Sequence, residues 1–337
     1  MGQQQQAWRG GTQGRLLTMN VFLTFDVEVW CNGWDHLDAA FPTSFERCVY
    51  GRSAHGDYAL PETLAILNRH GLKGIFFVEP LFARRFGKQY LEIIVRLIRD
   101  AGHRIQLHLH PEWTDEALEF IIEDCAIKRQ HLTHYTLDEQ TALIACGKEM
   151  LELAGSGPIS TFRSGNFAAN RDTFEALHRN KIFLDSSLNR HYQVSAPDLR
   201  DGHTFNRAFV TQGVTTFPAT VMTDGFGKDR PMQVGACSFG EMQDALLSAK
   251  SGGHRDFVVV SHNFEMLRPG TSRPDWIVVR RLERLCSFLA EHPGGFCVRE
   301  FGEDLKMPLD KDQRPSPQAS MLSTIHRYAE QIQRRMH

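Results

Sequence analysis

The sequence predicts an α/β protein built around a parallel sheet or barrel. Short apolar segments that suit buried strands alternate along the chain with amphipathic segments of about 10–15 residues that suit helices. Several strand segments also end directly at titratable side chains. The carboxyl ends of parallel strands are where functional groups collect in such proteins. Both observations therefore favour a parallel α/β architecture with a site at the strand ends.

Length and composition are those of a soluble globular protein of one or two domains. The chain has 337 residues, and an α/β barrel with extensions can fill that length as one domain. Apolar residues make up 42% and charged residues 23%, as in ordinary globular proteins. The formal net charge is −2, which gives no electrostatic argument for binding nucleic acid or an anionic membrane. We also find no apolar run long enough to be a transmembrane segment.

The amino-terminal residues and the cysteines predict a cytoplasmic protein. Residues 1–18 are rich in Gln and Gly and lack the apolar core of a signal peptide. We expect them to form a disordered extension, with the folded domain beginning at Met19. The 7 cysteines are scattered, odd in number and without a CxxC pair, which favours a reducing compartment over a disulfide framework.

The first strand, 21–30, ends in two acidic residues. Asp26 and Glu28 are two residues apart, so on an extended strand their carboxylates point to the same face. Two neighbouring acids are unfavourable unless a metal, a cation or a shared proton compensates them. The segment 31–58 that follows is expected to be a long irregular loop, and a loop of this length at a strand end is often functional.

Helices and strands are expected to alternate along the middle of the chain. Pro61 suits the first turn of a helix and Gly71 ends it. The further helices are expected at 90–101, 116–129, 137–154, 171–180, 239–250 and 280–291. The further strands are expected at 73–79, 104–110, 159–163, 182–184, 214–218, 257–261 and 295–299.

The strand at 104–110 carries two histidines on one face. Apolar and polar residues alternate along it, so that His108 and His110 point together, away from the apolar side. Two imidazoles so placed can bind one metal ion, and imidazole is a common zinc ligand. Glu112 follows four residues after His108.

Three more strands end at residues able to take part in catalysis. Arg163, Asp185 and His262 each close a separate strand segment. A parallel barrel would bring these strand ends into one mouth together with the two acids and the two histidines.

These motifs together resemble those of the NodB-type polysaccharide deacetylases, carbohydrate esterase family four, over residues 20–304. The segments that carry the resemblance are LTFDVE (23–28), GHRIQLHLHP (102–111), TFRSGN (161–166), DSSLN (185–189) and VVVSH (258–262). The resemblance implies a distorted, incomplete TIM-type (β/α) barrel over residues 19–305. It also implies a metal-dependent hydrolase that removes acetyl groups, chiefly N-acetyl groups, from a sugar or a polysaccharide precursor.

The resemblance further assigns roles in catalysis. Asp26 would be the general base that deprotonates water, and Arg163 would pair with it. His262 would be the acid that protonates the leaving group, with Asp185 tuning it.

Metal and substrate residues follow in the same way. The divalent metal, expected to be zinc, would be held by Glu28, His108 and His110, with Glu112 as the alternative third ligand. We expect an acetylated carbohydrate as the partner. The expected substrate-binding residues are Trp30, Trp34, Asn166 and Asn189.

Three departures from the family pattern keep alternatives open. Val27 stands where the family has a second Asp, Glu112 stands where the HxxxH motif has its second His, and the Pro of the RxPxG motif is missing after Arg163. The alternatives are a metal-independent or non-sugar C–N hydrolase of the allantoinase-like kind, and a non-catalytic carbohydrate-binding relative. Residues 306–337 are expected to form a linker and a helical tail, peripheral or a contact in a homo-oligomer.

Overall fold

The computed structural model describes residues 18–123, 127–192, 199, 206–302 and 314–336. Nearly all of the predicted amino-terminal extension and most of the predicted linker after residue 305 lie outside the described residues. The boundaries proposed for the extension and the linker therefore stay predictions.

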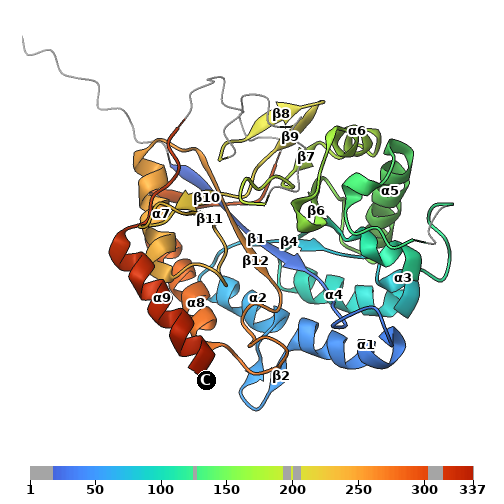
Figure 1. Cartoon of the computed structure of the whole chain (residues 1–337), viewed down its shortest axis with the longest axis horizontal. Helices are drawn as coiled ribbons and strands as arrows, with labels where there is room; N and C mark the ends of the chain where they lie inside the picture. Colours follow the sequence, from blue (N-terminus) through green and yellow to red (C-terminus); the bar gives the residue numbers. More distant parts are fainter. Residues whose placement is uncertain (1–17, 124–126, 193–198, 200–205, 303–313, 337) are drawn as a thin grey trace, which may run out of the picture.

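A curled, mostly parallel sheet forms the centre of the protein (Figure 1). Its strands are β1 Met19–Val27, β4 Ile75–Val78, β5 Arg104–Leu109, β6 Thr161–Ser164, β7 Leu184–Asp185, β8 Phe209–Thr211, β9 Val214–Thr216, β12 Asp256–His262 and β13 Phe296–Val298. Their order is β12-β1-β4-β5-β6-β7-β9-β8, with β13 beside the start of β1. Only the β8–β9 pair among them is antiparallel. The sheet is thus an incomplete barrel, as predicted.

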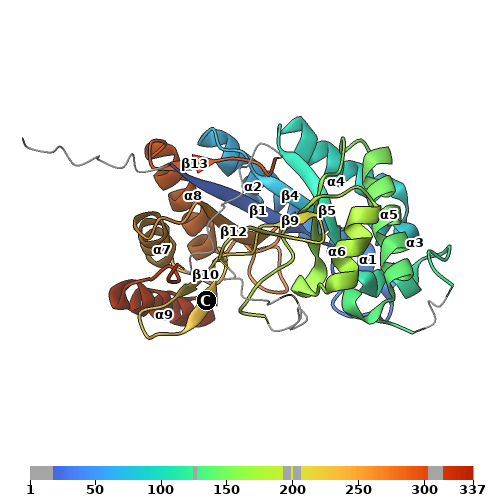
Figure 2. The ribbon, with the colours of Figure 1, turned by 90° about the horizontal axis from the view of Figure 1, so that it is seen from above.

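Helices surround this sheet, as Figure 2 shows from above. They are α1 Leu37–Phe45, α2 Leu60–Arg69, α3 Ala83–Phe86, α4 Lys88–Asp100, α5 Leu137–Leu153, α6 Arg171–Arg179, α7 Phe239–Ser251, α8 Trp276–Glu291 and α9 Met321–Met336. The amphipathic helix α4 shows why they form: Leu91, Ile94, Val95 and Ile98 are buried at helical spacing.

Aromatic side chains fill the inside of the barrel at its amino-terminal end. Phe22 of β1 stacks on Phe301 with ring centroids 4.4 Å apart, and Phe217 and Phe77 complete the cluster. Phe22 shares its face of β1 with Asp26 because successive side chains alternate. The interior is therefore apolar toward the amino ends of the strands and polar toward their carboxyl ends.

An antiparallel hairpin runs along the free side of β12. Its strands are β10 Val221–Thr223 and β11 Asp229–Pro231. The chain that follows forms a parallel bridge between Gln233 and Val260. This connection places Gln233 at the mouth of the barrel, near the end of β12.

The expected irregular loop at 31–58 is only partly irregular. It contains α1, a π-helical turn Glu46–Tyr50 and the small hairpin of β2 Arg52–Ser53 with β3 Gly56–Asp57. Phe41 supplies the packing that stabilises α1, because its ring stacks on Phe86 with a centroid distance of 3.7 Å. Pro42 lies inside this helix, a position where proline is ordinarily unfavourable, so the sequence gives little indication of the element.

The prediction of a helix over 116–129 is wrong. A short 3₁₀ helix, Pro111–Glu116, is followed by irregular chain in the described residues. Leu118 is 76% exposed and Phe120 79% exposed, so this segment has no buried apolar face to stabilise a helix. The ammonium group of Lys128 instead bonds the Glu112 carbonyl at 2.8 Å.

The predicted carboxy-terminal helix is present as α9, but it is not peripheral. Arg327 on α9 is fully buried and bonds both Asp224 and Glu241 at 2.9 Å. Arg281 of α8 bonds Glu330 of α9 at 2.6 Å. These buried ion pairs tie α9 to the body of the domain. Homo-oligomer formation stays a prediction.

No helix in the described ranges combines the length and the apolar character needed to cross a membrane.

Candidate active site

A cavity of about 480 Å³ opens at the carboxyl ends of the strands. Its lining includes most of the residues expected to form the site: Asp26, Glu28, Trp30, His108, His110, Asn166, Asn189 and His262. The alternation of β1 and β5 explains this, since each expected pair sits on the inward face of its strand. The barrel therefore brings residues from five segments of the chain to one mouth.

Glu28 and the two histidines converge on one point. Oε1 of Glu28 lies 2.9 Å from Nε2 of His108 and 3.0 Å from Nε2 of His110. All three side chains are buried, and their ligand atoms lie within 4.8 Å of one another. The indole Nε1 of Trp30 donates to the other carboxylate oxygen of Glu28 at 2.5 Å. This arrangement can hold a metal ion.

The outer nitrogen of each histidine is fixed by a partner. Nδ1 of His108 donates to the backbone carbonyl of Arg163 at 2.8 Å, because a carbonyl can only accept. Nδ1 of His110 lies 3.2 Å from Oε2 of Glu112. Both Nε2 atoms are thereby directed inward, which is the arrangement found around metal-binding histidines. Glu112 orients His110 here rather than joining the converging set.

The pKa values of Glu28 and His110 depend strongly on each other's charge. Burial alone would lower the pKa of His110, but Glu28 and Glu112 raise it well above its ordinary value. Burial would likewise raise the pKa of Glu28, but His110 and His108 lower it well below its ordinary value. The cluster thus holds a buried carboxylate beside an imidazolium.

The expected pairing of Asp26 with Arg163 is present. Nη1 of Arg163 donates to Oδ1 of Asp26 at 2.7 Å, and both side chains are buried. Nη2 of Arg163 donates to Thr24 at 2.9 Å and to Ser186 at 3.0 Å, while the guanidinium carbon lies 4.3 Å above the ring of Phe77. These contacts fix the guanidinium group of Arg163, and its hydrogen bond in turn fixes the orientation of the Asp26 carboxylate.

His262 stands opposite Asp26 across the β1–β12 pair, where the two residues are in register. Its side chain is 24% exposed, so the ring is open to the cavity. Nδ1 of His262 lies 2.8 Å from Oε1 of Glu265. Burial alone would lower the pKa of His262, but the hydrogen bond with Glu265 and the charges of Glu28 and Asp26 raise it to about 9.

Asp185 does not make the expected contact with His262. Its carboxylate accepts hydrogen bonds from the Ser187 hydroxyl at 2.5 Å, the Ser187 backbone N–H at 2.9 Å and the Thr216 hydroxyl at 2.7 Å. The side chain is fully buried, and burial raises its pKa. Asp185 therefore organises the ends of β7 and β9, and Glu265 occupies the place predicted for it.

The four residues expected to bind substrate divide into two kinds. Trp30, Asn166 and Asn189 line the cavity, whereas Trp34 does not and instead packs edge-on against Trp113 at 4.9 Å. Nδ2 of Asn189 is buried without a hydrogen-bond partner among the described residues. An unpaired buried donor beside a cavity is suited to a ligand acceptor.

Two residues that shape the site were not expected from the sequence. Glu265 follows His262 by three residues, and Asn263 follows it directly. Asn263 exchanges hydrogen bonds with the backbone of Glu28, both at 3.1 Å, and donates to the Cys48 carbonyl at 2.6 Å. The local sequence HNFE was the available signal, since a carboxylate three residues from a histidine can reach it in a turn.

A second group of possible ligands overlaps the first. Asp26, Glu28 and His262 also place ligand atoms within 4.8 Å of one another. Glu28 belongs to both groups, so it is the carboxylate most central to any metal site here. The first group is buried throughout, and its histidines have the supporting partners described above.

Comparison with known proteins identifies the architecture. By sequence, the chain matches no family model and no curated protein. By structure, it is similar to a protein from Mycobacterium smegmatis that carries the name polysaccharide deacetylase. The TM-score is 0.50 at 18% identity, and the match covers 88% of this chain and 97% of that one. The chain has the polysaccharide deacetylase fold. At this identity the similarity establishes the fold and leaves the activity to be argued from the site.

Two further solved structures are similar to the chain. A 4-alpha-glucanotransferase from Thermococcus litoralis has a TM-score of 0.55 at 12% identity, over 90% of this chain and 43% of that one. A family 4 carbohydrate esterase from Streptomyces lividans, in complex with acetate, has a TM-score of 0.44 at 14% identity, over 87% and 98%.

Proposed function

We propose that this protein is a metal-dependent hydrolase that removes acetyl groups, chiefly from the nitrogen of an acetylated sugar or polysaccharide precursor. One observation carries the proposal. The cavity brings a possible metal site, Glu28 with His108 and His110, together with two further groups able to transfer protons. These are Asp26, which is paired with Arg163, and His262, which is paired with Glu265. Amide hydrolysis needs a polarised carbonyl, a base for water and an acid for the leaving amine. The cavity offers candidates for all three.

The donor set fits a divalent ion. Two imidazole nitrogens and one carboxylate oxygen form the ligand combination of many catalytic zinc sites, which leave further positions open. Glu28, His108 and His110 would hold the ion, with Glu112 and the Arg163 carbonyl orienting the rings. When bound, zinc supplies Lewis-acid chemistry that polarises a carbonyl and lowers the pKa of a water molecule.

Asp26 acts as the general base in this proposal. Arg163 and the strand register hold its carboxylate at the cavity. A base must lie within hydrogen-bond reach of the proton that it removes, and this geometry is fixed before substrate arrives. Asp26 takes a proton from the attacking water as the new C–O bond forms.

His262 acts as the general acid. With its pKa raised to about 9, the ring is protonated at neutral pH and has a proton to give. It donates that proton to the sugar nitrogen as the C–N bond breaks, so that the amine leaves in neutral form. Glu265 keeps the ring oriented and supports its positive charge.

Trp30, Asn166 and Asn189 position the sugar. The indole of Trp30 borders the cavity and is held by its bond to Glu28, so it gives a fixed wall for a sugar ring. The unpaired Nδ2 of Asn189 supplies a donor for a hydroxyl or carbonyl oxygen of the substrate.

Acetate release tests this function. The purified protein should be stripped of metal, reloaded with zinc and given N-acetylglucosamine, its oligosaccharides and matched O-acetylated sugars. We expect zinc-dependent acetate release that is greatest with N-acetyl substrates. Acetate release that persists after chelation would favour a metal-independent hydrolase. Sugar binding without turnover by the zinc-loaded protein would favour a non-catalytic relative.

A further inference from the structure

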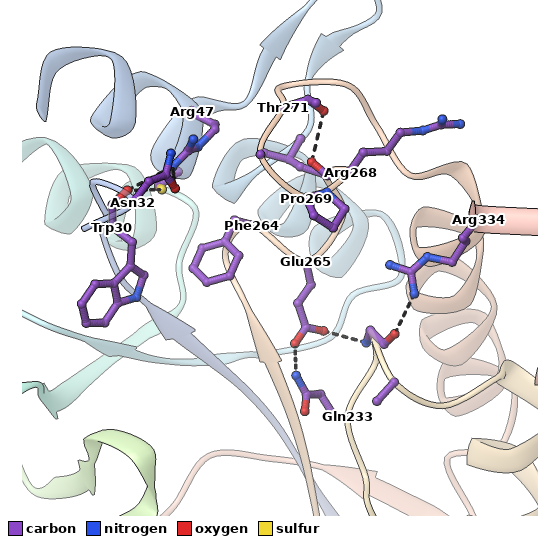
Figure 3. A pocket seen from close by; sticks show the side chains of 15 residues that line it. Trp30, Asn32, Arg47, Gln233, Phe264, Glu265, Arg268, Pro269, Thr271 and Arg334 are labelled. Atoms are coloured by element: carbon purple, nitrogen blue, oxygen red, sulfur yellow. Dashed lines mark hydrogen bonds between the residues drawn. The ribbon is translucent and has the colours of Figure 1, made fainter. Parts of the chain in front are cut away.

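A second cavity of about 440 Å³ lies beside the candidate active site (Figure 3). The two cavities share Trp30 and Gln233 as lining residues. Glu265, which lines the second cavity, bonds His262 of the first. A ligand that spans both cavities would therefore pass directly beside the proposed acid.

The second cavity is built largely from the loop that follows β12 and from the loop that follows β1. Phe264 lies at its centre in Figure 3, with Trp30 on one side and Pro269 on the other. These rings give flat apolar walls of the kind that stack on sugar or other ring systems. The cavity volume matches that of the first cavity, so there is room for a group comparable to the reacting sugar.

The charges around this cavity are mostly positive. Its charged lining residues are Arg47, Arg268, Arg334 and Glu265. In Figure 3, Arg47 and Arg334 lie on opposite sides of Phe264, while Arg268 extends outward from the loop. An arginine that lines a cavity without a carboxylate partner favours an oxyanion there, because arginine matches phosphate and carboxylate geometry with paired N–H donors.

The single acidic residue does not cancel these charges, because Glu265 is already engaged. One carboxylate oxygen accepts from the Gly235 backbone at 2.6 Å and from Ser261 at 3.1 Å. The other bonds His262 at 2.8 Å and also accepts from the amide of Gln233. The carboxylate of Glu265 is thus directed to His262 and to these donors.

Arg47 is held in place by neutral partners, which leaves its positive charge available to an anion. Its Nη2 donates to the Trp30 carbonyl at 3.0 Å and to Oδ1 of Asn32 at 3.2 Å. Both partners are neutral, and no carboxylate pairs with Arg47 in the described part of the chain. These two bonds hold the guanidinium in place without neutralising it. Arg334 differs, since its Nε pairs with Asp275 at 2.6 Å.

We propose that the second cavity binds a phosphate group joined to the acetylated sugar, so that the substrate is a phosphorylated sugar or its phosphodiester. This inference rests on the proposed function for the position of the sugar. Arg47 binds the phosphate oxygens, and Trp30 and Phe264 flank the group that the phosphate carries on its other side. A neutral acetylated sugar would leave Arg47 without an anionic partner.

Equilibrium binding of non-reacting ligands tests the proposal without any need for turnover. Calorimetry would compare glucosamine 1-phosphate, glucosamine and glucuronate with the zinc-loaded protein and with Arg47→Gln and Arg47→Lys. Arg96→Gln is the matched control, because Arg96 is an exposed arginine on α4. We expect glucosamine 1-phosphate to bind at least about tenfold more tightly than glucosamine.

The variants then separate the outcomes. In Arg47→Gln the affinities for glucosamine 1-phosphate and glucosamine should differ by no more than about threefold. Arg47→Lys should restore part of the preference for the phosphorylated sugar, and Arg96→Gln should keep it in full. Equal binding of the two glucosamine ligands by the unmodified protein would overturn the proposal. Loss of the preference in Arg96→Gln, or its full retention in Arg47→Gln, would overturn it too. Tighter, Arg47-dependent binding of glucuronate would overturn the assignment to phosphate. All these results are independent of whether acetate is released.

Discussion

Nδ1 of His262, the last residue of β12, lies 2.8 Å from Oε1 of Glu265 in the turn that follows. The proposed acid and its carboxylate partner are therefore carried by one continuous segment, the end of β12 and the loop after it. Glu265 is itself held by Gly235, Ser261 and Gln233. A short, well-supported loop thus sets both the orientation and the charge of His262.

Replacing Glu265 should move the alkaline limit of activity downward. His262 must be protonated to act as the acid, so activity is lost as the pH rises through its pKa of about 9. Glu265→Gln removes the carboxylate that raises this pKa, so the loss should begin at a lower pH, by about one unit or more. The pH profile of kcat measures it. Glu149→Gln, at an exposed site on α5, is the control and should give the same pH profile as the unmodified protein. An unchanged alkaline side of the profile in Glu265→Gln would exclude the proposal that Glu265 raises the pKa of His262.

Zinc affinity should distinguish the ligands from the residue that orients them. Glu112 bonds Nδ1 of His110 from outside the converging group, so Glu112→Gln should weaken zinc binding by about 10–100-fold. His110→Ala removes a ligand and should weaken binding far more. Competition with a chromogenic chelator gives both values. If Glu112→Gln lost zinc as completely as His110→Ala, Glu112 would have to be a ligand itself.

The buried arginine of α9 should be important for stability. Arg327 bonds Asp224 and Glu241 with no exposure to solvent. Arg327→Ala would leave the buried carboxylate of Glu241 without its cation and Asp224 with Arg230 as its remaining partner, which costs about 3–5 kcal/mol of unfolding free energy. Urea unfolding checks the value. Arg335→Ala on the exposed side of α9 should change stability by less than about 0.5 kcal/mol. A similarly small effect of Arg327→Ala would show that its buried ion pairs contribute little to stability.

His103 should make the protein less stable in mild acid. Its Nδ1 accepts from the Gly74 backbone at 3.2 Å, and burial, aided by Lys73, lowers its pKa to about 4. The unfolded chain binds a proton near pH 6.5, whereas the folded chain does so only near pH 4. This contribution to stability is therefore complete above about pH 6.5 and is lost as the pH falls to about 4, by up to about 3 kcal/mol.

A variant without a titrating group isolates this effect. His103→Asn keeps an acceptor for the Gly74 N–H but cannot gain the proton. Thermal or urea unfolding between pH 7 and pH 4 should show a shallower loss of stability than in the unmodified protein. Parallel stability curves for the two proteins would assign the acid sensitivity to other groups.

Much of the fold and the site follows from patterns that a sequence displays directly. Strand alternation put Asp26 with Glu28 and His108 with His110, and both pairs do face the cavity. The strand-end rule placed Arg163 at the same mouth as Asp26, and the pairing of the two that the family resemblance implied is present. Each of these depended on a regular strand, in which the direction of a side chain is fixed by its position.

The remaining features depend on irregular chain or on packing between distant segments. Asp185 sits at a strand end as expected, but its carboxylate turns to Ser187 and Thr216, a choice that strand position alone does not decide. Glu265 reaches His262 only because the loop after β12 folds back. The packing of α9 depends on Arg327 meeting two acids more than 80 residues away, and spacing along the chain does not reveal such contacts.

The division of work between the two acids of β1 is the centre of this account, and one paired measurement tests it. Zinc content and acetate release should be determined on the same preparations of Asp26→Asn and Glu28→Gln. We predict that Asp26→Asn keeps one equivalent of zinc but loses about 100-fold or more of its activity, whereas Glu28→Gln loses the zinc itself. Zinc loss in Asp26→Asn together with zinc retention in Glu28→Gln would contradict the account.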